Sequence, residues 1–201
     1  HKPRSRPADS GAPFTLANHP VVDITWYEAL AFTRWLTTRL HATGYFTSDW
    51  CATLPSEAEW EKAARGSDTR VYPWGNKLTP DCANYKDASI GTTSAVGCFA
   101  NGASPYGLEE IGGNVWEWTR SIWGANPEAT ESHYPYRSNT NSERLDAGND
   151  IARVLRGGSF AFFGQDARCA ARSWGFPYAV HKSLGFRVVL LPTAALSISA
   201  P

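Results

Sequence analysis

The residue types best suited to redox chemistry or to a soft metal are few in this chain and dispersed along it. None of the four cysteines belongs to a C-x-x-C pair, the spacing that zinc sites commonly use, so we expect no zinc site. Cys82 and Cys98 are spaced so that they could close a short loop by a disulfide or remain free thiols. The residues concerned are Cys51, Cys82, Cys98, Cys169, His19, His41, His133 and His181.

A different chemistry, binding through aromatic contact, is indicated near the C-terminus. The segments 160–166 and 173–183 alternate with the motifs RGGS, ARCAAR and LGFRV. Neither segment alternates apolar and polar residues or forms a β-branched run, as a core strand would. Their mixture of aromatic, small and polar residues is typical of binding loops. The predicted ligand-binding residues are Ala161, Phe162, Phe163, Gly164, Asp166, Ser173, Trp174, Gly175, Phe176, Tyr178, Ala179, Val180 and His181.

The composition limits the classes of partner. The 201 residues can bury one substantial core, which favours a single domain. Lys and Arg number 19 and Asp and Glu number 19, which argues against a nucleic-acid or membrane-surface partner. No apolar run is long enough to cross a membrane. Nine tryptophans with 17 glycines and 13 prolines favour a loop-rich fold. The absence of methionine indicates a trimmed chain, and the sequence leaves its compartment open.

Two capping boxes predict two helices. Thr25 and Glu28 stand three residues apart at the start of a helix expected over residues 26–41. Ser56 and Glu59 repeat the device at the start of the second helix, whose Trp60, Ala63 and Ala64 should face the core. The first helix should bury an apolar face of Leu30, Trp35, Leu36 and Leu40.

The rest of the chain predicts little regular structure. Gly66 should end the second helix in the left-handed conformation, and residues 67–150 show no sustained period. Short strands are expected over 153–155 and 186–191. The arginines of the motifs are expected to make structural bonds with loop carbonyls and carboxylates, as the guanidinium fork favours. They are Arg156, Arg168, Arg172 and Arg187.

Seven motifs in a fixed order carry a family resemblance. LPSEAEWEKAARG, YPWGN, ANY, SPYGLEEIGGNVWEWT, RVLRGGS, RCAAR and LGFRV together resemble the formylglycine-generating enzyme, or sulfatase-modifying factor, family over residues 19–191. The resemblance implies an α+β C-type lectin fold with two helices, short antiparallel strands and much ordered loop. The opening strands usual in that family have no match. We expect a lead-in over 1–18, a domain over 19–192 and a tail over 193–201.

The resemblance also shows where the family's chemistry is missing. The enzymes oxidise a substrate cysteine with copper held by two cysteines shortly after GGS, because thiolates bind Cu(I) well. Here Phe162 stands at the first of these positions, and no cysteine precedes Cys169. We therefore expect no copper and no such oxidation. The iron-binding histidine motif of the related sulfoxide synthases has no counterpart either.

The resemblance implies two structural calcium sites, since Ca²⁺ favours a mixture of carboxylates and carbonyls. The first site would use the side chains of Glu110 and Glu117 with the carbonyls of Gly113 and Val115. The alternative for these residues is that Trp116 and Trp118 are core anchors and that Glu117 caps a buried turn. The second would use the side chains of Asn84 and Asp87 with the carbonyls of Tyr85 and Ser89.

One group with this fold diversifies a stretch near the C-terminus: the variable proteins of diversity-generating retroelements. Adenine mutagenesis turns their AAY codons into NNY codons, which exclude Trp, Gln and Lys. Twelve of the predicted binding residues fit that set, whereas Gln165, Trp174 and Lys182 do not.

The leading hypothesis is a non-catalytic binding domain of this kind, with a protein or peptide ligand. The alternatives are an enzyme of the superfamily with altered chemistry, for example a metal held by His181 and Asp166, and an accessory sensor domain of a signalling protein. A segment or domain preceding this chain would be a further partner.

Overall fold

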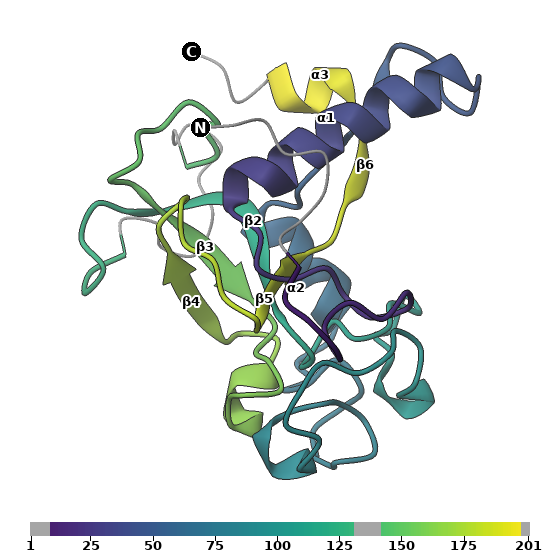
Figure 1. Ribbon diagram of the computed structural model, residues 1–201, viewed down its shortest axis with the longest axis vertical. Coiled ribbons are helices and arrows are strands. Elements are labelled where there is room, and N and C mark those ends of the chain that lie inside the picture. Colours follow the sequence, from purple (N-terminus) through teal and green to yellow (C-terminus); the bar gives the residue numbers. More distant parts are fainter. Residues whose placement is uncertain (1–8, 131–141, 198–201) are drawn as a thin grey trace.

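The computed structural model describes residues 9–130 and 142–197, and it is an α+β structure rich in loops (Figure 1). None of the helices in these residues is long and apolar enough to span a membrane. The elements are α1 (Trp26–Ala42), β1 (Trp50–Thr53), α2 (Glu57–Arg65), η1 (Lys86–Ala88), η2 (Ala100–Gly102), β2 (Trp116–Gly124), β3 (Ala152–Arg156), η3 (Gly164–Ala167), β4 (Arg172–Gly175), β5 (Leu184–Phe186), β6 (Val189–Pro192) and α3 (Thr193–Ser197).

Both predicted helix starts are confirmed. Thr25 and Glu28 form a complete capping box before α1, and Ser56 and Glu59 form another before α2. Each box satisfies backbone N–H groups that the first turn of a helix leaves without partners. Gly66 does end α2 with a positive φ of 76°, but its ψ of −137° is not the left-handed helical conformation that the sequence predicted.

The strands form two sheets. The larger has the order β4-β3-β2-β5, in which β2 and β5 run parallel and the other pairs antiparallel, so the prediction of antiparallel strands alone was incomplete. The smaller pairs β1 with β6. The strand predicted over 186–191 is divided into β5 and β6, because the chain leaves one sheet for the other after Phe186. α3 lies within the predicted tail.

The central strand β2 was not predicted. Residues 116–124 were expected to be irregular, and they form the longest strand of the structure as described. All but one of its residues are buried, so it lacks the alternation that marks a half-exposed strand. β1 and β4 also escaped prediction, since each has only four residues.

The two long helices cover opposite faces of the larger sheet. Leu155 packs in one cluster with Trp26 and Leu30 of α1, whereas the next residue, Arg156, pairs with carboxylates on α2. Successive strand residues point to opposite faces. The other core cluster, beneath α2, contains Trp60, which is buried as predicted.

The predicted apolar face of α1 is only partly buried. Leu30 is in the core, but Trp35 is 55% exposed, against expectation. Leu36 and Leu40 are half-buried. The reason is visible in Figure 1, where the C-terminal half of α1 extends beyond the larger sheet and so leaves Trp35 without core to pack on.

Candidate ligand-binding surface

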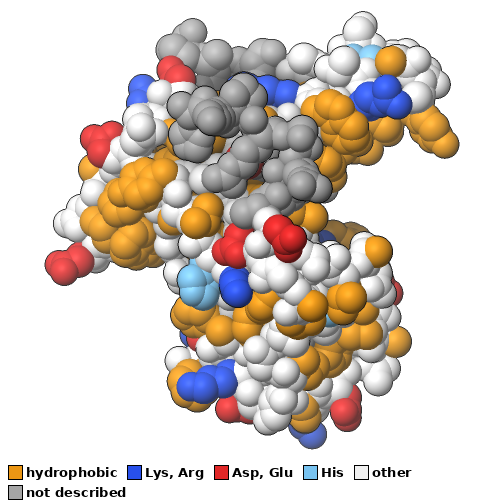
Figure 2. Space-filling model, viewed as in Figure 1, with side chains coloured by type: hydrophobic (Ala, Val, Ile, Leu, Met, Phe, Trp, Pro, Cys, Tyr) orange, Lys and Arg blue, Asp and Glu red, His pale blue; other side chains and the backbone are white. Residues whose placement is uncertain are grey.

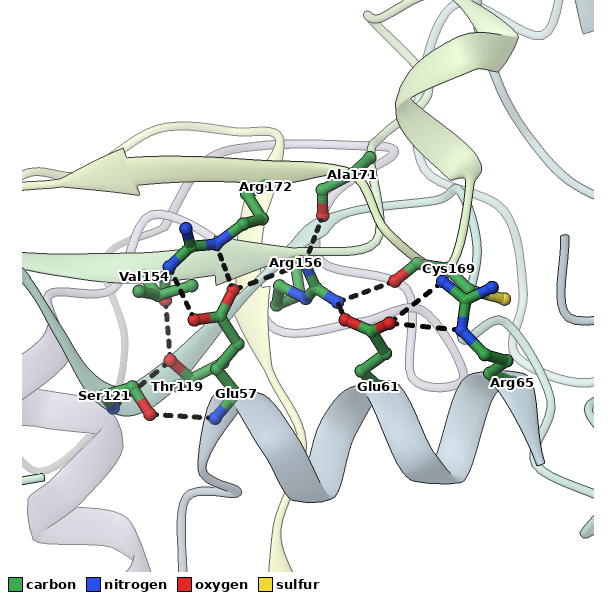
Figure 3. Close-up of polar contacts among 10 residues, drawn as sticks. All are labelled: Glu57, Glu61, Arg65, Thr119, Ser121, Val154, Arg156, Cys169, Ala171 and Arg172. Carbon is green, nitrogen blue, oxygen red and sulfur yellow. Dashed lines mark hydrogen bonds and ion pairs between the residues drawn. The ribbon is translucent and has the colours of Figure 1, made fainter. Parts of the chain in front are cut away.

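The two predicted binding segments are separated by the stretch Cys169–Arg172, which we call the anchored stretch. Its last residue, Arg172, pairs with a carboxylate of α2 in a network of ion pairs (Figure 3). Glu57 is fully buried and accepts hydrogen bonds from Nε and Nη2 of Arg172, at 2.5 and 2.8 Å. Arg156 lies 3.3 Å from Glu57 and donates to Glu61 at 2.5 Å. The two carboxylates on one helix face thus neutralise two arginines of neighbouring strands, β3 and β4.

Arg156 also fixes the backbone of the anchored stretch. It donates to the carbonyl of Cys169 at 2.6 Å and to that of Ala171 at 2.8 Å. Cys169 is fully buried, and burial raises the pKa of its thiol to about 11. The structural role predicted for Arg156 and Arg172 is therefore confirmed.

The segment before the anchored stretch presents exposed rings. Phe162 and Phe163 are 42% and 52% exposed. The ring of Phe162 stands edge-on to Trp116 at 5.8 Å, and its carbonyl accepts the N–H of Lys86 at 2.8 Å. The Lys86 ammonium lies 4.3 Å from the centre of the Phe163 ring. Ala161 is exposed as well. We call the three exposed residues Ala161, Phe162 and Phe163 the Phe162 cluster.

The segment after the anchored stretch forms a row of three rings. Trp174 contacts Phe176 edge-on at 5.5 Å, and Phe176 stacks on Tyr178 at 5.6 Å with ring planes 2° apart. Tyr178 is 60% exposed, while the other two rings are half-buried. The carbonyl of Pro177 accepts the N–H of Trp26 at 3.0 Å, which holds this aromatic row to the start of α1.

Two of the predicted binding residues lie inside the protein. A side chain at Gly164 would meet Leu78, and one at Gly175 would come within 2.8 Å of the Trp118 ring. Both glycines are buried, so they allow close packing and do not face a ligand. Asp166 is half-buried, and burial raises the pKa of its carboxyl.

The remaining predicted residues flank the aromatic row along the chain. Val180 and His181 are exposed, and Ser173 and Ala179 are half-buried. The Nδ1 atom of His181 is 2.7 Å from the hydroxyl of Ser183.

The folded chain brings the start of the segment 160–166 close to the end of the segment 173–183. Trp116 contacts Phe162 with its ring and donates its backbone N–H to the carbonyl of Ser183. The centre of the Phe14 ring lies 6.1 Å from that of the Phe160 ring and 5.0 Å from the Lys182 ammonium. On the face drawn in Figure 2, hydrophobic side chains gather in separate groups, and acidic, basic and histidine side chains lie between the group at the left and the group below it.

Phe14 and Lys86 were missed by the sequence reasoning. Each is a single residue far along the chain from the predicted binding segments, and only the folded geometry places it against Phe160 or Phe163. No periodicity or motif could have marked them.

The residues of the first predicted calcium site do not fit a cation. The Glu117 carboxylate accepts Nε and Nη2 of Arg187, at 2.6 and 2.7 Å, and Nε1 of Trp60 at 2.7 Å. Arg187 also donates to the carbonyls of Glu109 and Glu110 at 3.2 Å. A positive charge thus already lies among these oxygens. The Glu110 carboxylate accepts the N–H of Gly97, and the N–H of Gly113 donates to the Gly157 carbonyl, while Val115 is buried.

The second predicted calcium set fits better. Asn84 is buried and donates to the Thr92 carbonyl at 2.8 Å, but its Oδ1 accepts no hydrogen bond. Tyr85 is buried, and exposed Asp87 and Ser89 lie within and just after η1. The described residues contain no group of three or more His, Cys, Asp or Glu that could hold a metal.

All four cysteines are free, so Cys82 and Cys98 are not bridged. The Thr79 hydroxyl donates to the sulfur of Cys82 at 2.9 Å.

The fold and its sites define a class, the formylglycine-generating-enzyme type of C-type lectin fold, as the sequence predicted. The model of the sulfatase-modifying factor enzyme 1-like domain matches residues 4–191, and the chain belongs to that family. The chain is 36% identical over 193 residues to the formylglycine-generating enzyme of Thermomonospora curvata, covering 87% of this chain and 56% of that protein. It is 36% identical over 175 residues to the serine/threonine-protein kinase pkn1 of Chlamydia caviae, covering 85% and 24%.

The solved structures agree on the fold. Treponema denticola variable protein 1 matches with a TM-score of 0.68 and 25% identity, over 93% of this chain and 75% of that one. PvdO from Pseudomonas aeruginosa matches with a TM-score of 0.64 and 23% identity, over 85% and 61%. The chain thus spans about half the length of the formylglycine-generating enzymes that it matches, at 56% and 46% for two of them.

Proposed function

We propose that the chain is a non-catalytic binding domain whose surface is made by the Phe162 cluster and the aromatic row. The observation that carries this proposal is the exposure of Phe162, Phe163 and Tyr178 on segments that backbone hydrogen bonds hold in place. A preorganised ring loses little entropy on binding, and covering one contributes about 1.5–3 kcal/mol. The ligand class that suits such a surface is a protein or peptide.

The thiol chemistry of the chain supports a role without copper oxidation. Phe162 stands where the resemblance would place the first metal-binding cysteine, and its side chain offers no ligand atom. Cys169 is the nearest cysteine along the chain, but burial raises the pKa of its thiol to about 11. It therefore supplies almost no thiolate at neutral pH, and the thiolate is the form that binds Cu(I).

The biological setting that we propose is a retroelement-diversified variable protein. The structural likeness to Treponema denticola variable protein 1 supports this setting, as does the agreement of exposed Ala161, Phe162, Phe163 and Tyr178 with the NNY codon set. In this setting different copies of the domain would bind different ligands.

A structural calcium ion at Asn84 forms part of the proposal. The unbonded Oδ1 of Asn84 and the carboxylate of Asp87 are oxygen donors of the kind that Ca²⁺ prefers. The ion would order the loop that carries Lys86. Because Lys86 contacts Phe162 and Phe163, an ordered loop would also hold the Phe162 cluster in place.

Two other functions have support of their own. The kinase pkn1 of Chlamydia caviae, of which the match covers 24%, favours an accessory domain of a signalling protein. The formylglycine-generating enzymes among the relatives favour an enzyme. An enzyme would need a metal held without cysteine, for example by His181 and Asp166.

The test measures copper and cysteine oxidation in parallel. The protein is incubated with one equivalent of Cu(I) and a competing chelator, then with a cysteine-containing peptide and oxygen. We expect the chelator to retain the copper and the peptide to keep its cysteine. A tightly held equivalent of copper, or formylglycine in the peptide, would overturn the non-catalytic assignment. The variant Phe162→Cys is a control for whether one thiol restores copper retention.

A further inference from the structure

Two exposed lysines lie over aromatic rings at the two ends of the Phe162 cluster. The Lys86 ammonium is 4.3 Å from the centre of the Phe163 ring, at one end. The Lys182 ammonium is 5.0 Å from the centre of the Phe14 ring, and Phe14 contacts Phe160, which directly precedes the other end. Both lysines are exposed. The proposed binding surface therefore carries positive charge near both ends of its first segment.

Lys86 is held against the Phe162 cluster at two points. Its backbone N–H donates to the Phe162 carbonyl at 2.8 Å, and its ammonium lies over the Phe163 ring. The attraction between a cation and an aromatic face restricts a side chain that otherwise has many rotamers. A restricted ammonium loses less entropy when it binds an anion than a freely moving one does. The contact thus prepares Lys86 for a charged ligand.

Neither ammonium has a carboxylate partner in the part of the chain that the structure describes. Asp87 directly follows Lys86, but both lie in η1, and successive residues of a 3-10 helix point about 120° apart. Asp23 donates its N–H to the carbonyl of His181, but its carboxylate accepts the hydroxyl of Ser10. Both exposed ammonium groups are therefore free to pair with an anion on a ligand.

In the proposed setting of a diversified protein, both lysines would be constant. Lys86 lies outside the two predicted binding segments, and Lys182 does not fit the NNY codon set. The exposed residues Ala161, Phe162 and Phe163 fit that set and would vary from copy to copy. The charge that a ligand meets would then stay the same, while the side chains that distinguish one ligand from another change.

We propose that Lys86 and Lys182 make this surface selective for acidic protein or peptide segments, in which Asp or Glu side chains flank an apolar side chain. The apolar side chain would cover the Phe162 cluster, and the carboxylates would pair with the two ammonium groups through charge-assisted hydrogen bonds. Complementary charge of this kind sets partner choice and speeds association. The inference rests on the proposed function, because it assigns a ligand class to the same surface.

The test selects peptides from a phage library of random dodecapeptides on the whole immobilised chain at low salt. We expect the enriched peptides to contain more Asp and Glu than the unselected library, next to aromatic or aliphatic residues. Enriched peptides without this excess would overturn the proposal and leave the proposed function standing. If no peptide were enriched, the proposed binding function would fail, and the ligand class with it.

Variants locate the charge that selects the peptides. Lys86→Gln and Lys182→Gln should each reduce the excess of Asp and Glu, and should each raise the Kd of an acidic peptide from the first selection about two- to fivefold. Arg34→Gln is the matched control, because it removes one positive charge from an exposed position on α1. It should change neither quantity. A loss in Arg34→Gln as large as in the lysine variants would overturn the proposal.

Salt dependence gives a second measurement on the same acidic peptide. Its affinity should fall as NaCl is added, because salt screens exposed charges, and it should fall less steeply when both lysines are replaced by Gln. An equal salt dependence in the wild-type protein and the double variant would contradict the proposal. Phe162→Ala tests the proposed function separately, since it should abolish enrichment, whereas the lysine variants should still enrich peptides of neutral composition.

Discussion

The stretch Cys169–Arg172 and the segments on either side of it are continuous in sequence but are held by different forces. The stretch is tied to α2 and β3 by buried charges and carbonyl contacts. Its neighbours expose Phe162, Phe163 and Tyr178 and are fixed through a few backbone hydrogen bonds. The difference shows how a fold can keep its shape while a neighbouring surface changes. Side-chain contacts fix the anchored stretch Cys169–Arg172, which we call the frame, whereas backbone hydrogen bonds fix the loops on either side of it.

The largest effect should come from breaking the ion network. Glu57→Gln leaves Arg156 and Arg172 without their shared charge, and the free energy of unfolding should fall by about 3–5 kcal/mol. Urea denaturation measures the loss. The control Asp68→Asn breaks an exposed pair with Arg70 and should leave the urea midpoint unchanged. Equal effects of the two variants would contradict the distinction between frame and surface.

A smaller loss should follow from adding one methyl group inside the second segment. In Gly175→Ala the new Cβ atom comes within 2.8 Å of the Trp118 ring, so the core must shift at a cost of about 1–3 kcal/mol. Thermal unfolding followed by circular dichroism checks it against Ala161→Ser, an exposed substitution. If Gly175 tolerated alanine as well as Ala161 tolerates serine, that position would be free to vary.

Removing exposed rings should change stability little. Phe162→Ala and Tyr178→Ala should each cost under about 1 kcal/mol, while ligand binding should be lost. Phe160→Ala is the buried counterpart and should cost about 3 kcal/mol. Denaturation of the three variants gives the comparison, and a loss at Tyr178 as large as at Phe160 would make Tyr178 a core residue.

The smallest expected effect is that of calcium. Adding CaCl2 should raise the Tm by an amount that grows with the logarithm of its concentration, because the ion binds only the folded state. The same concentrations of MgCl2 should act less, since Mg²⁺ gives up its waters reluctantly. In Asn84→Ala the calcium-dependent part of the Tm should disappear; its persistence would place the ion elsewhere.

Local signals along the chain were sufficient to predict the helix starts and the family. The capping boxes at Thr25 and Ser56 each lie within four residues, and the cap geometry depends on nothing distant. β2 could not be predicted, because a strand buried on both faces has no alternation. The prediction that Trp35 is buried was wrong, because the burial of a helix residue depends on where the sheet beneath the helix ends.

The sequence predicted which segments form the candidate surface, but it did not predict which of their residues are exposed or which distant residues contact them. The exposure of Phe162 and Tyr178 agrees with the expected binding segments, and Gly164 and Gly175 do not face outward. The contact of Lys86 with Phe163 joins residues far apart in the sequence. Such contacts follow from tertiary packing and carry no local pattern.

The most direct test of the account is to sequence the codons for residues 153–190 in many close isolates. The account predicts dense variation in adenine-derived codons at exposed positions such as Phe162, Tyr178 and His181. It predicts none over Cys169–Arg172 or at Gly175, where the frame would break. Variation no denser here than in the rest of the gene, or variation that falls on the anchored stretch, would contradict a diversified binding surface.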